Sequence, residues 1–310
     1  MHPPILHLLA LAEPLLQVNP FKLEAAVPLL APIVLFIAWW RGWFSLGAGG
    51  SGSGKSRKAN SKPGGATGGG GGDLEPPIYL MLALCVFFAF AFAAVGLQSL
   101  PESLLGSEKS LQRTAAVTMI LYTFGGAAVL VIGQLIAAKV GSAAAGWVTI
   151  KPLDIIKGIA LVVFLFPALA LVNVGAMLGY KLITGNEPEQ IAHEQLRQIL
   201  DNRTNPWAIG LIAAAVLGAP LVEEFIYRGL LLRGVLKASQ MPWLSVIITS
   251  VLFAGVHVGS AGPHALPVLF ALAVAMAITL VRTNKLGLAV GMHIGFNAIN
   301  VLLAFWLQSR

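Results

Sequence analysis

Charged side chains are scarce in this chain. They make up 11% of its 310 residues, whereas hydrophobic side chains make up 57%. Soluble globular domains usually carry about 25% charged residues, so this composition excludes an ordinary soluble fold. Apolar runs of about 20 residues, the length that crosses a bilayer, recur along the sequence. We therefore predict an all-α, polytopic bundle of about eight transmembrane helices whose surroundings are a lipid bilayer.

Cysteine is almost absent as well. The single cysteine, Cys85, lies within an apolar run. Its isolation excludes an intramolecular disulfide and a metal site built from cysteines. The N-terminus lacks the basic region of a cleavable signal peptide, so we do not expect a removed leader.

Acidic residues are fewer than basic ones, at 13 against 20, and the formal net charge is +7. In a soluble protein such an excess could indicate a nucleic-acid partner. Here the basic residues flank apolar runs, as they do at the cytoplasmic ends of membrane spans. We therefore expect lipid contacts and no nucleic-acid partner.

The apolar runs predict where the spans lie. They cover residues 23–40, 77–98, 114–138, 155–183, 207–237, 242–258, 266–283 and 286–308. These runs divide the chain into an N-terminal interfacial segment with the first span (1–40), a linker (41–76), membrane helices (77–184), an extramembrane polar loop (185–205) and a C-terminal membrane core (206–310).

The linker, residues 41–76, contains 13 glycines, several serines and five basic side chains. This composition predicts a flexible, solvated tether without a fold of its own. The basic linker favours the cytoplasm, and alternation of the spans then places loop 139–154 and the turns near Lys237 and Lys285 on the same side. The loop 185–205 and both termini are predicted on the opposite side.

Two adjacent carboxylates, Glu223 and Glu224, lie well inside the fifth predicted span. A charge in a bilayer costs at least about 2.5–3.5 kcal/mol on insertion scales, so such residues are candidates for function. Glu224 and Arg228 share a helix face at spacing i, i+4, which suits an ion pair. Glu223 points about 100° away around the helix and has no evident partner there. A pair that only fixes helix packing is the alternative for Glu224 and Arg228.

Later spans carry further polar side chains. His257 ends the sixth predicted span, and His293 and Asn297 share a face of the eighth at spacing i, i+4. A lone histidine on an apolar helix is more often a packed core residue, but these three converge with the acids in a chain that avoids charge. Of the remaining histidines, we expect His2, His7 and His193 at the surface. We expect His264 in a loop or at the rim of the site.

These residues resemble three motifs of the CAAX protease and bacteriocin-processing (CPBP) family, which includes the type II CAAX prenyl endopeptidases. E-E-x-x-x-R matches Glu223, Glu224 and Arg228, F-x-x-x-H matches Phe253 and His257, and H-x-x-x-N matches His293 and Asn297. The resemblance covers about residues 206–301. It implies an intramembrane endopeptidase in which Glu223 and His257 activate water, His293 and Asn297 stabilise the oxyanion, and Glu224 with Arg228 holds the catalytic helix.

The cofactor stays open at this point. Glu223, His257 and His293 could instead bind zinc, because a His₂Glu set with one open position is a known catalytic arrangement. The resemblance implies either a metalloprotease or a glutamate-type protease. The sequence contains no H-E-x-x-H motif that would favour zinc independently.

Two other functions compete with proteolysis. One is a non-catalytic scaffold or bacteriocin self-immunity protein of the same fold, and the other is a transporter with a proton relay. The complete motif set argues against the scaffold, and the lack of visible inverted repeats argues against the transporter. We expect a peptide or protein substrate in the membrane, with a CAAX tail as the family's eukaryotic case. The short loops and glycine-rich tether suit a bacterial inner membrane.

Overall fold

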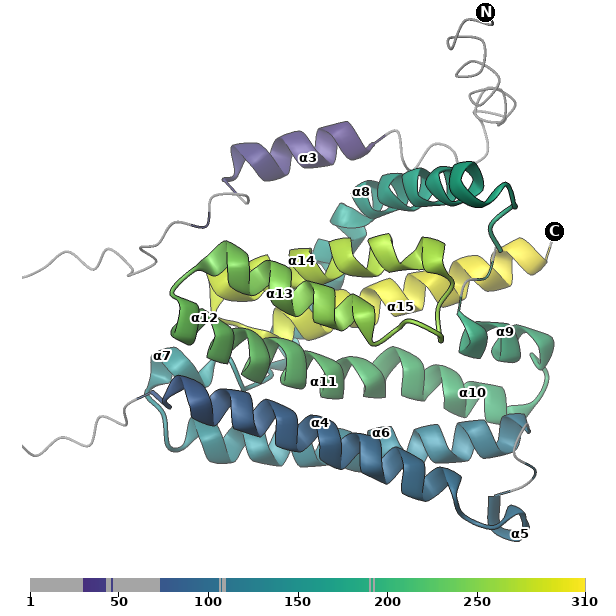
Figure 1. Ribbon diagram of the computed structural model, residues 1–310, viewed down its shortest axis with the longest axis horizontal. Coiled ribbons are helices and arrows are strands. Elements are labelled where there is room, and N and C mark those ends of the chain that lie inside the picture. The colour runs from purple at the N-terminus through teal and green to yellow at the C-terminus, as the bar shows by residue number, and fades with distance from the viewer. Residues whose placement is uncertain are drawn as a thin grey trace, which may run out of the picture.

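The described chain is predominantly helical. The computed structural model describes residues 30–42, 46, 73–105, 107, 110–189, 191 and 193–309. Its α-helices are α3 (Ala31–Trp40), α4 (Pro76–Gln98), α5 (Glu102–Leu105), α6 (Leu111–Ala137), α7 (Ser142–Ala145), α8 (Pro152–Thr184), α9 (Glu194–Asp201), α10 (Pro206–Ala213), α11 (Ala219–Glu224), α12 (Arg233–Ser239), α13 (Pro242–Gly255), α14 (Leu266–Thr283) and α15 (Leu286–Gln308). Within these ranges there are isolated β-bridges but no strand, so the all-α prediction is confirmed (Figure 1).

Six helical segments among the described residues are long and apolar enough to cross a membrane. They are Pro76–Gln98, Leu111–Ala137, Pro152–Thr184, Pro206–Ser239, Pro263–Thr283 and Leu286–Gln308. The sixth predicted span contains α13, whose 14 residues rise only about 21 Å, less than the apolar thickness of a bilayer. The first predicted span is represented by the 10 residues of α3, and residues 23–29 lie outside the described ranges. The chain is an integral, multi-pass membrane protein.

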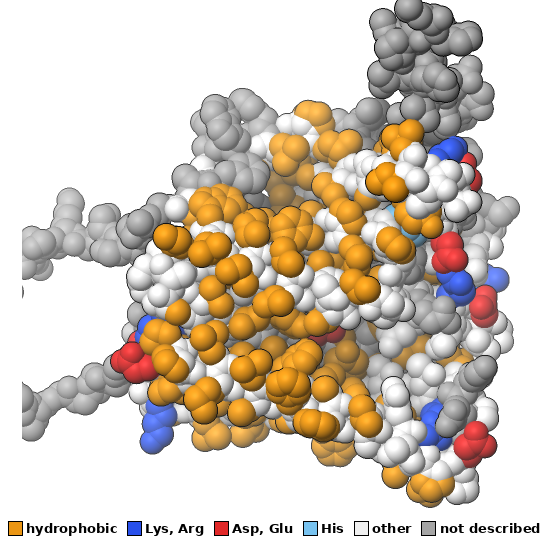
Figure 2. Space-filling view, in the orientation of Figure 1, with side chains coloured by type: hydrophobic (Ala, Val, Ile, Leu, Met, Phe, Trp, Pro, Cys, Tyr) orange, Lys and Arg blue, Asp and Glu red, His pale blue; other side chains and the backbone are white. Residues whose placement is uncertain are grey.

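The charged side chains lie mainly near the ends of the helices, as a membrane-spanning bundle requires. Apolar side chains cover most of the face shown in Figure 2, and charged side chains collect toward the two ends of the helices. The turns after α6, between α12 and α13, and between α14 and α15 lie at one end of the bundle (Figure 1). These are the basic turns that the topology prediction places on one side. The predicted loop 185–205 contains the short helix α9 at the other end.

The fifth span is one long helix with two π-helical segments. The segments are η1 (Ala214–Gly218) and η2 (Phe225–Leu232), on either side of α11. Pro220 on α11 has no N–H and cannot make the regular helical hydrogen bond. π-Segments often occur at functional sites because the wider turn rotates the side chains that follow. The carboxylates of Glu223 and Glu224 lie between the two segments.

Three glycines bring α15 close to α8. Gly287, Gly291 and Gly295 are spaced four residues apart, so they line one face of α15. A methyl group on Gly291 would overlap the backbone of Ile155, and one on Gly295 would reach the side chain of Val162. Small residues allow membrane helices to approach this closely. The contact fixes the rotation of α15, which carries His293 and Asn297.

The last residues of the predicted linker contact the site helix. Asp73 accepts hydrogen bonds from the Tyr79 hydroxyl at 2.7 Å and from Arg233 Nη2 at 2.5 Å, and Lys237 Nζ lies 3.1 Å away. The Arg233 guanidinium lies 4.7 Å from the centre of the Trp147 ring. Burial alone would raise the pKa of Asp73, but hydrogen bonds from Tyr79, Lys237 and Arg233 outweigh it and hold the pKa below its ordinary value. We call these four side chains the Asp73 cluster: Asp73 itself and its partners Tyr79, Arg233 and Lys237.

The Asp73 cluster predicts a pH-dependent stability. Because the pKa of Asp73 is lower in the folded state, the carboxylate stabilises the fold fully above its ordinary pKa of 3.8, and that stabilisation disappears as the pH falls through the folded value. Asp73→Asn should therefore lower the free energy of unfolding by about 1–3 kcal/mol at pH 7 and by much less near pH 3. Thermal unfolding of the detergent-solubilised protein, followed by tryptophan fluorescence, measures both. Glu189→Gln, which removes an exposed ion pair with Arg197, is the control. A pH-independent effect of Asp73→Asn would contradict the prediction.

Candidate active site

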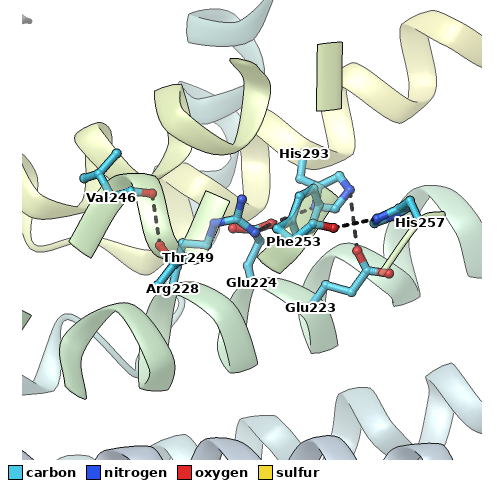
Figure 3. A network of polar contacts seen from close by, with 8 residues as sticks. All are labelled: Glu223, Glu224, Arg228, Val246, Thr249, Phe253, His257 and His293. Carbon is cyan, nitrogen blue, oxygen red and sulfur yellow. Dashed lines mark hydrogen bonds and ion pairs between the residues drawn. The ribbon is translucent and has the colours of Figure 1, made fainter. Parts of the chain in front are cut away.

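Glu224 joins two helices at the centre of the site. Its Oε1 atom lies 2.8 Å from Arg228 Nη1 on its own helix and 2.8 Å from His293 Nδ1 on α15 (Figure 3). A carboxylate only accepts hydrogen bonds, so Nδ1 of His293 carries a proton and donates it. The side chains of Glu224 and Arg228 are 0% and 1% exposed, and that of His293 is 5% exposed. The predicted ion pair is present, and it extends to a third residue.

Arg228 is held by an aromatic ring as well as by its carboxylate. Its guanidinium carbon lies 4.1 Å from the centre of the Phe253 ring on α13, which permits a cation–π interaction. Only Nη1 has a hydrogen-bond partner among the described residues, and Nε and Nη2 are buried without one. An unmade hydrogen bond on a buried polar group costs about 1–3 kcal/mol, and more on a charged group. Burying the Arg228 guanidinium therefore costs free energy, which its contacts with Glu224 and Phe253 must offset.

Glu223 occupies a different environment from Glu224. Its side chain is 22% exposed, and its Oε2 atom lies 3.9 Å from Nε2 of His293. This distance is too long for a direct hydrogen bond and suits a bridging water molecule. Tyr122 on α6 lies close enough for its hydroxyl to interact with the Glu223 carboxylate. No motif predicted Tyr122, because its approach depends on the packing of α6 against η1, where Gly218 contacts it.

His257 lies just beyond the end of α13. Its Nδ1 atom is 2.8 Å from the Phe253 carbonyl oxygen, so Nδ1 donates and Nε2 is left as the other ring nitrogen. The Phe253 ring lies between the two imidazoles, with centroid distances of 5.0 Å to His257 and 5.6 Å to His293. Figure 3 shows both imidazoles turned toward Glu223. The three motifs are thus brought to one place by three different helical segments.

Asn297 lies one turn beyond His293 on α15. Its side-chain amide nitrogen donates to the carbonyl oxygen of Ala215 at 2.9 Å. Ala215 belongs to η1, where the i to i+5 pattern changes the pairing of backbone groups. Because an amide nitrogen carries two hydrogens, one of them is still available to a ligand. The contact also ties α15 to the site helix.

The metal hypothesis can be tested on the donors. Among the described residues, no three side chains of His, Cys, Asp or Glu are placed so that they could hold one ion. Nδ1 of His293 and Nδ1 of His257 are engaged by Glu224 and by a backbone carbonyl, which leaves Nε2 as the open nitrogen of each ring. The described structure therefore does not bring Glu223, His257 and His293 together as ligands of one ion, which is one of the two possibilities that the sequence leaves open.

The other histidines differ in placement. His264 is buried, and its ring lies 5.6 Å from the ring of Tyr180 on α8, so it packs inside the loop rather than lining a rim. His193 forms an isolated backbone bridge with Ala261, which follows His257 in the same loop. His2 and His7 lie outside the described residues.

The geometry supplies the groups that hydrolysis of an acyl bond requires. A partly exposed carboxylate can accept a proton from a water molecule, and one imidazole can orient that water. The N–H groups of the other imidazole and of the amide can stabilise negative charge on an oxygen atom. Buried side chains on three helical segments hold these groups, which favours a preorganised site.

Comparison with known protein families gives a match in the part of the chain that forms this site. Residues 205–299 match the family model described as type II CAAX prenyl endopeptidase Rce1-like. The match covers all three motifs and ends within α15. No curated protein and no solved structure gives a match.

Removing Arg228 should destabilise the fold. Arg228→Ala leaves the fully buried Glu224 without its cation, and breaking a buried pair in this way typically costs about 3–5 kcal/mol. Arg228→Lys retains the charge and should recover part of that loss. Glu223→Gln is the matched control, because Glu223 has no direct ion-pair contact shorter than 3.9 Å and is partly exposed. Thermal unfolding in detergent distinguishes the variants, and equal stability of Arg228→Ala and Glu223→Gln would refute the assigned role.

Proposed function

We propose, on the premise that residues 205–299 belong to the Rce1-like family, that this membrane protein is an endopeptidase that cleaves peptide bonds within the bilayer. The observation that carries the proposal is the position of Glu223. It is a partly exposed carboxylate in the middle of a membrane helix, 3.9 Å from His293 and on the side of the site where His257 lies. A charge at this depth is costly unless it has a function.

Water activation is assigned to Glu223 and His257. A water molecule between them can donate one hydrogen to the Glu223 carboxylate and the other to Nε2 of His257, because Nδ1 of His257 is committed to the Phe253 carbonyl. Glu223 then removes the proton as the water oxygen attacks the carbonyl carbon of the substrate. General-base catalysis of this kind contributes about 10²–10⁴-fold to a rate.

The oxyanion is assigned to His293 and Asn297. With Nδ1 held by Glu224, Nε2 of His293 can donate to the tetrahedral oxygen when the ring carries its second proton. The second amide hydrogen of Asn297 can donate to the same oxygen, since the first is used by Ala215. One such donor is worth about 3 kcal/mol of transition-state stabilisation.

The cycle closes on Glu223. Collapse of the tetrahedral intermediate re-forms the carbonyl and breaks the C–N bond, and the proton held by Glu223 passes to the leaving nitrogen. One water molecule is consumed, and the products are a carboxylic acid and an amine. Glu223 returns to its starting form, and no further reactant is needed.

The substrate is proposed as a membrane-associated peptide or protein, with a CAAX-type tail as the class that the family description names. The compact turns between the helices, together with the glycine-rich tether, favour the bacterial plasma membrane as its location. A scaffold or self-immunity protein of the same fold is the competing function. It would need Glu224 and Arg228 for packing but would not need Glu223.

Substitution of Glu223 tests the proposal. Glu223→Gln keeps the size of the side chain and removes the base, so proteolysis should fall by at least about 100-fold. Mass spectrometry of membrane-protein termini, in cells that carry either the wild type or Glu223→Gln at matched expression, measures cleavage and identifies candidate substrates. A purified candidate is then incubated with the enzyme in liposomes.

The control for this experiment is Glu187→Gln, which alters an exposed carboxylate paired with Lys181. It should retain the wild-type cleavage pattern. Cleavage of the purified substrate at the wild-type rate by Glu223→Gln would overturn the mechanism, and identical termini in all three strains would favour the scaffold.

A further inference from the structure

Three fully buried side chains around the site hold polar atoms without a hydrogen-bond partner among the described residues. The atoms are Oε2 of Glu224, Nε and Nη2 of Arg228, and Oγ of Ser250. All three residues are 0% exposed. Buried polar groups are almost always hydrogen-bonded, and internal water is the usual partner where protein groups do not serve. The proposed mechanism uses none of these four atoms.

The unpartnered atoms belong to facing sides of one helix interface. Ser250 precedes Phe253 by three residues on α13, so the two side chains share a helix face. Phe253 lies over the Arg228 guanidinium, at 4.1 Å from its carbon atom to the ring centre. The face of α13 that carries Ser250 is therefore the face turned toward the bundle interior, where Arg228 and Glu224 lie. Three polar residues in one interface meet the requirement of a bound water for two or more partners.

Hydroxyl groups continue from this interface toward the basic end of the bundle. Ser245 and Thr249 are one helical turn apart on α13, and they are 0% and 1% exposed. The Ser245 hydroxyl lies 3.1 Å from that of Ser239, which is partly exposed at the end of α12. Thr249 donates to the Ser245 carbonyl at 2.9 Å, which leaves its oxygen free to accept. Figure 3 shows Thr249 and Arg228 at the same end of the network.

These hydroxyls interrupt a helix that is otherwise apolar. The outward face of α13 exposes Trp243, Leu244, Ile247, Ile248, Val251 and Leu252. The polar stripe therefore faces inward while the apolar stripe faces outward, which is the opposite of a soluble helix. Ser245 and Thr249 donate to carbonyl oxygens one turn back along the chain, at 2.8 and 2.9 Å, and their oxygens can still accept. Ser250 has no such partner among the described residues.

We propose that the interface between α13 and the site helix holds a chain of bound water molecules, from Ser239 at the basic end of the bundle to the Glu224–Arg228 pair. Ser245, Thr249 and Ser250 line the chain, and Arg228 and Glu224 end it. The water keeps the buried guanidinium solvated. That this chain also exchanges protons with the hydrolytic centre rests on the proposed function, whereas the chain itself does not.

Thiol accessibility tests for the water chain without any assay of cleavage. In a Cys85→Ala background, Ser245→Cys and Ser250→Cys each introduce one thiol of nearly the original size. The purified full-length variants in nanodiscs are treated with silver nitrate, because Ag⁺ is small enough to follow a narrow hydrated path and binds thiolates. The protein is then denatured, and the thiols that remain are counted with a fluorescent maleimide.

The matched control is Val162→Cys on α8, since Val162 is 0% exposed and packs in an apolar cluster that contains no residue of α13. We expect Ag⁺ to block most of the thiol in Ser245→Cys and Ser250→Cys and little of it in Val162→Cys. Protection of all three thiols would overturn the proposal. Equal reaction of all three would also overturn it, because it would indicate general opening of the bundle rather than a defined path.

A second variant tests the direction of the path. Adding Ser245→Leu to Ser250→Cys places an apolar side chain across the proposed route, and we expect at least a tenfold slower reaction of the remaining thiol with Ag⁺. An unchanged rate would show that water reaches Ser250 from elsewhere and would overturn the assigned route. Loss of peptidase activity is not part of either readout, so failure of this inference and failure of the proposed function remain separate results.

Discussion

The site depends on one buried carboxylate. Glu224 Oε1 accepts a hydrogen bond from Arg228 on its own helix and another from His293 on α15, each at 2.8 Å. An unpaired charge in the bilayer interior would cost at least about 2.5–3.5 kcal/mol, so both donors are held to the carboxylate. This contact sets the depth and rotation of the site helix against α15. Glu223, the preceding residue, is thereby directed elsewhere and stays partly exposed.

Close backbone packing makes such a polar site compatible with a membrane protein. Gly291 on α15 lies against the backbone of Ile155 on α8, and Gly133 on α6 lies against Val148 and the ring of Phe225. Helices in a bilayer gain little from apolar burial, so close van der Waals contact and buried hydrogen bonds must hold them together. The glycines provide the first of these, and the Glu224 network provides the second. The Asp73 cluster adds a third contact, where the chain enters α4.

Several features of the fold and the site follow from the sequence. The lack of charge predicted the membrane helices, and the i, i+4 spacing predicted the contact between Glu224 and Arg228, which the structure shows at 2.8 Å. Hydropathy did not predict the length of α13. Val256 and Val258 continue the apolar run, but the helix ends at Gly255 and a loop bears His257. The π-segments on either side of α11 left no signal that a 3.6-residue period could detect.

The sequence by itself determined a membrane bundle, the three motifs and the residues that carry them, because composition and local spacing are properties of the chain alone. Only the tertiary structure decided how those residues are used. It made His293 the second partner of Glu224, brought Tyr122 beside Glu223 and tied Asn297 to Ala215. Among the described residues it placed no three potential ligands around one ion. The physical reason is that a helix fixes only which of its own residues share a face. The rotation and depth of one helix against another depend on packing between segments that are far apart in sequence.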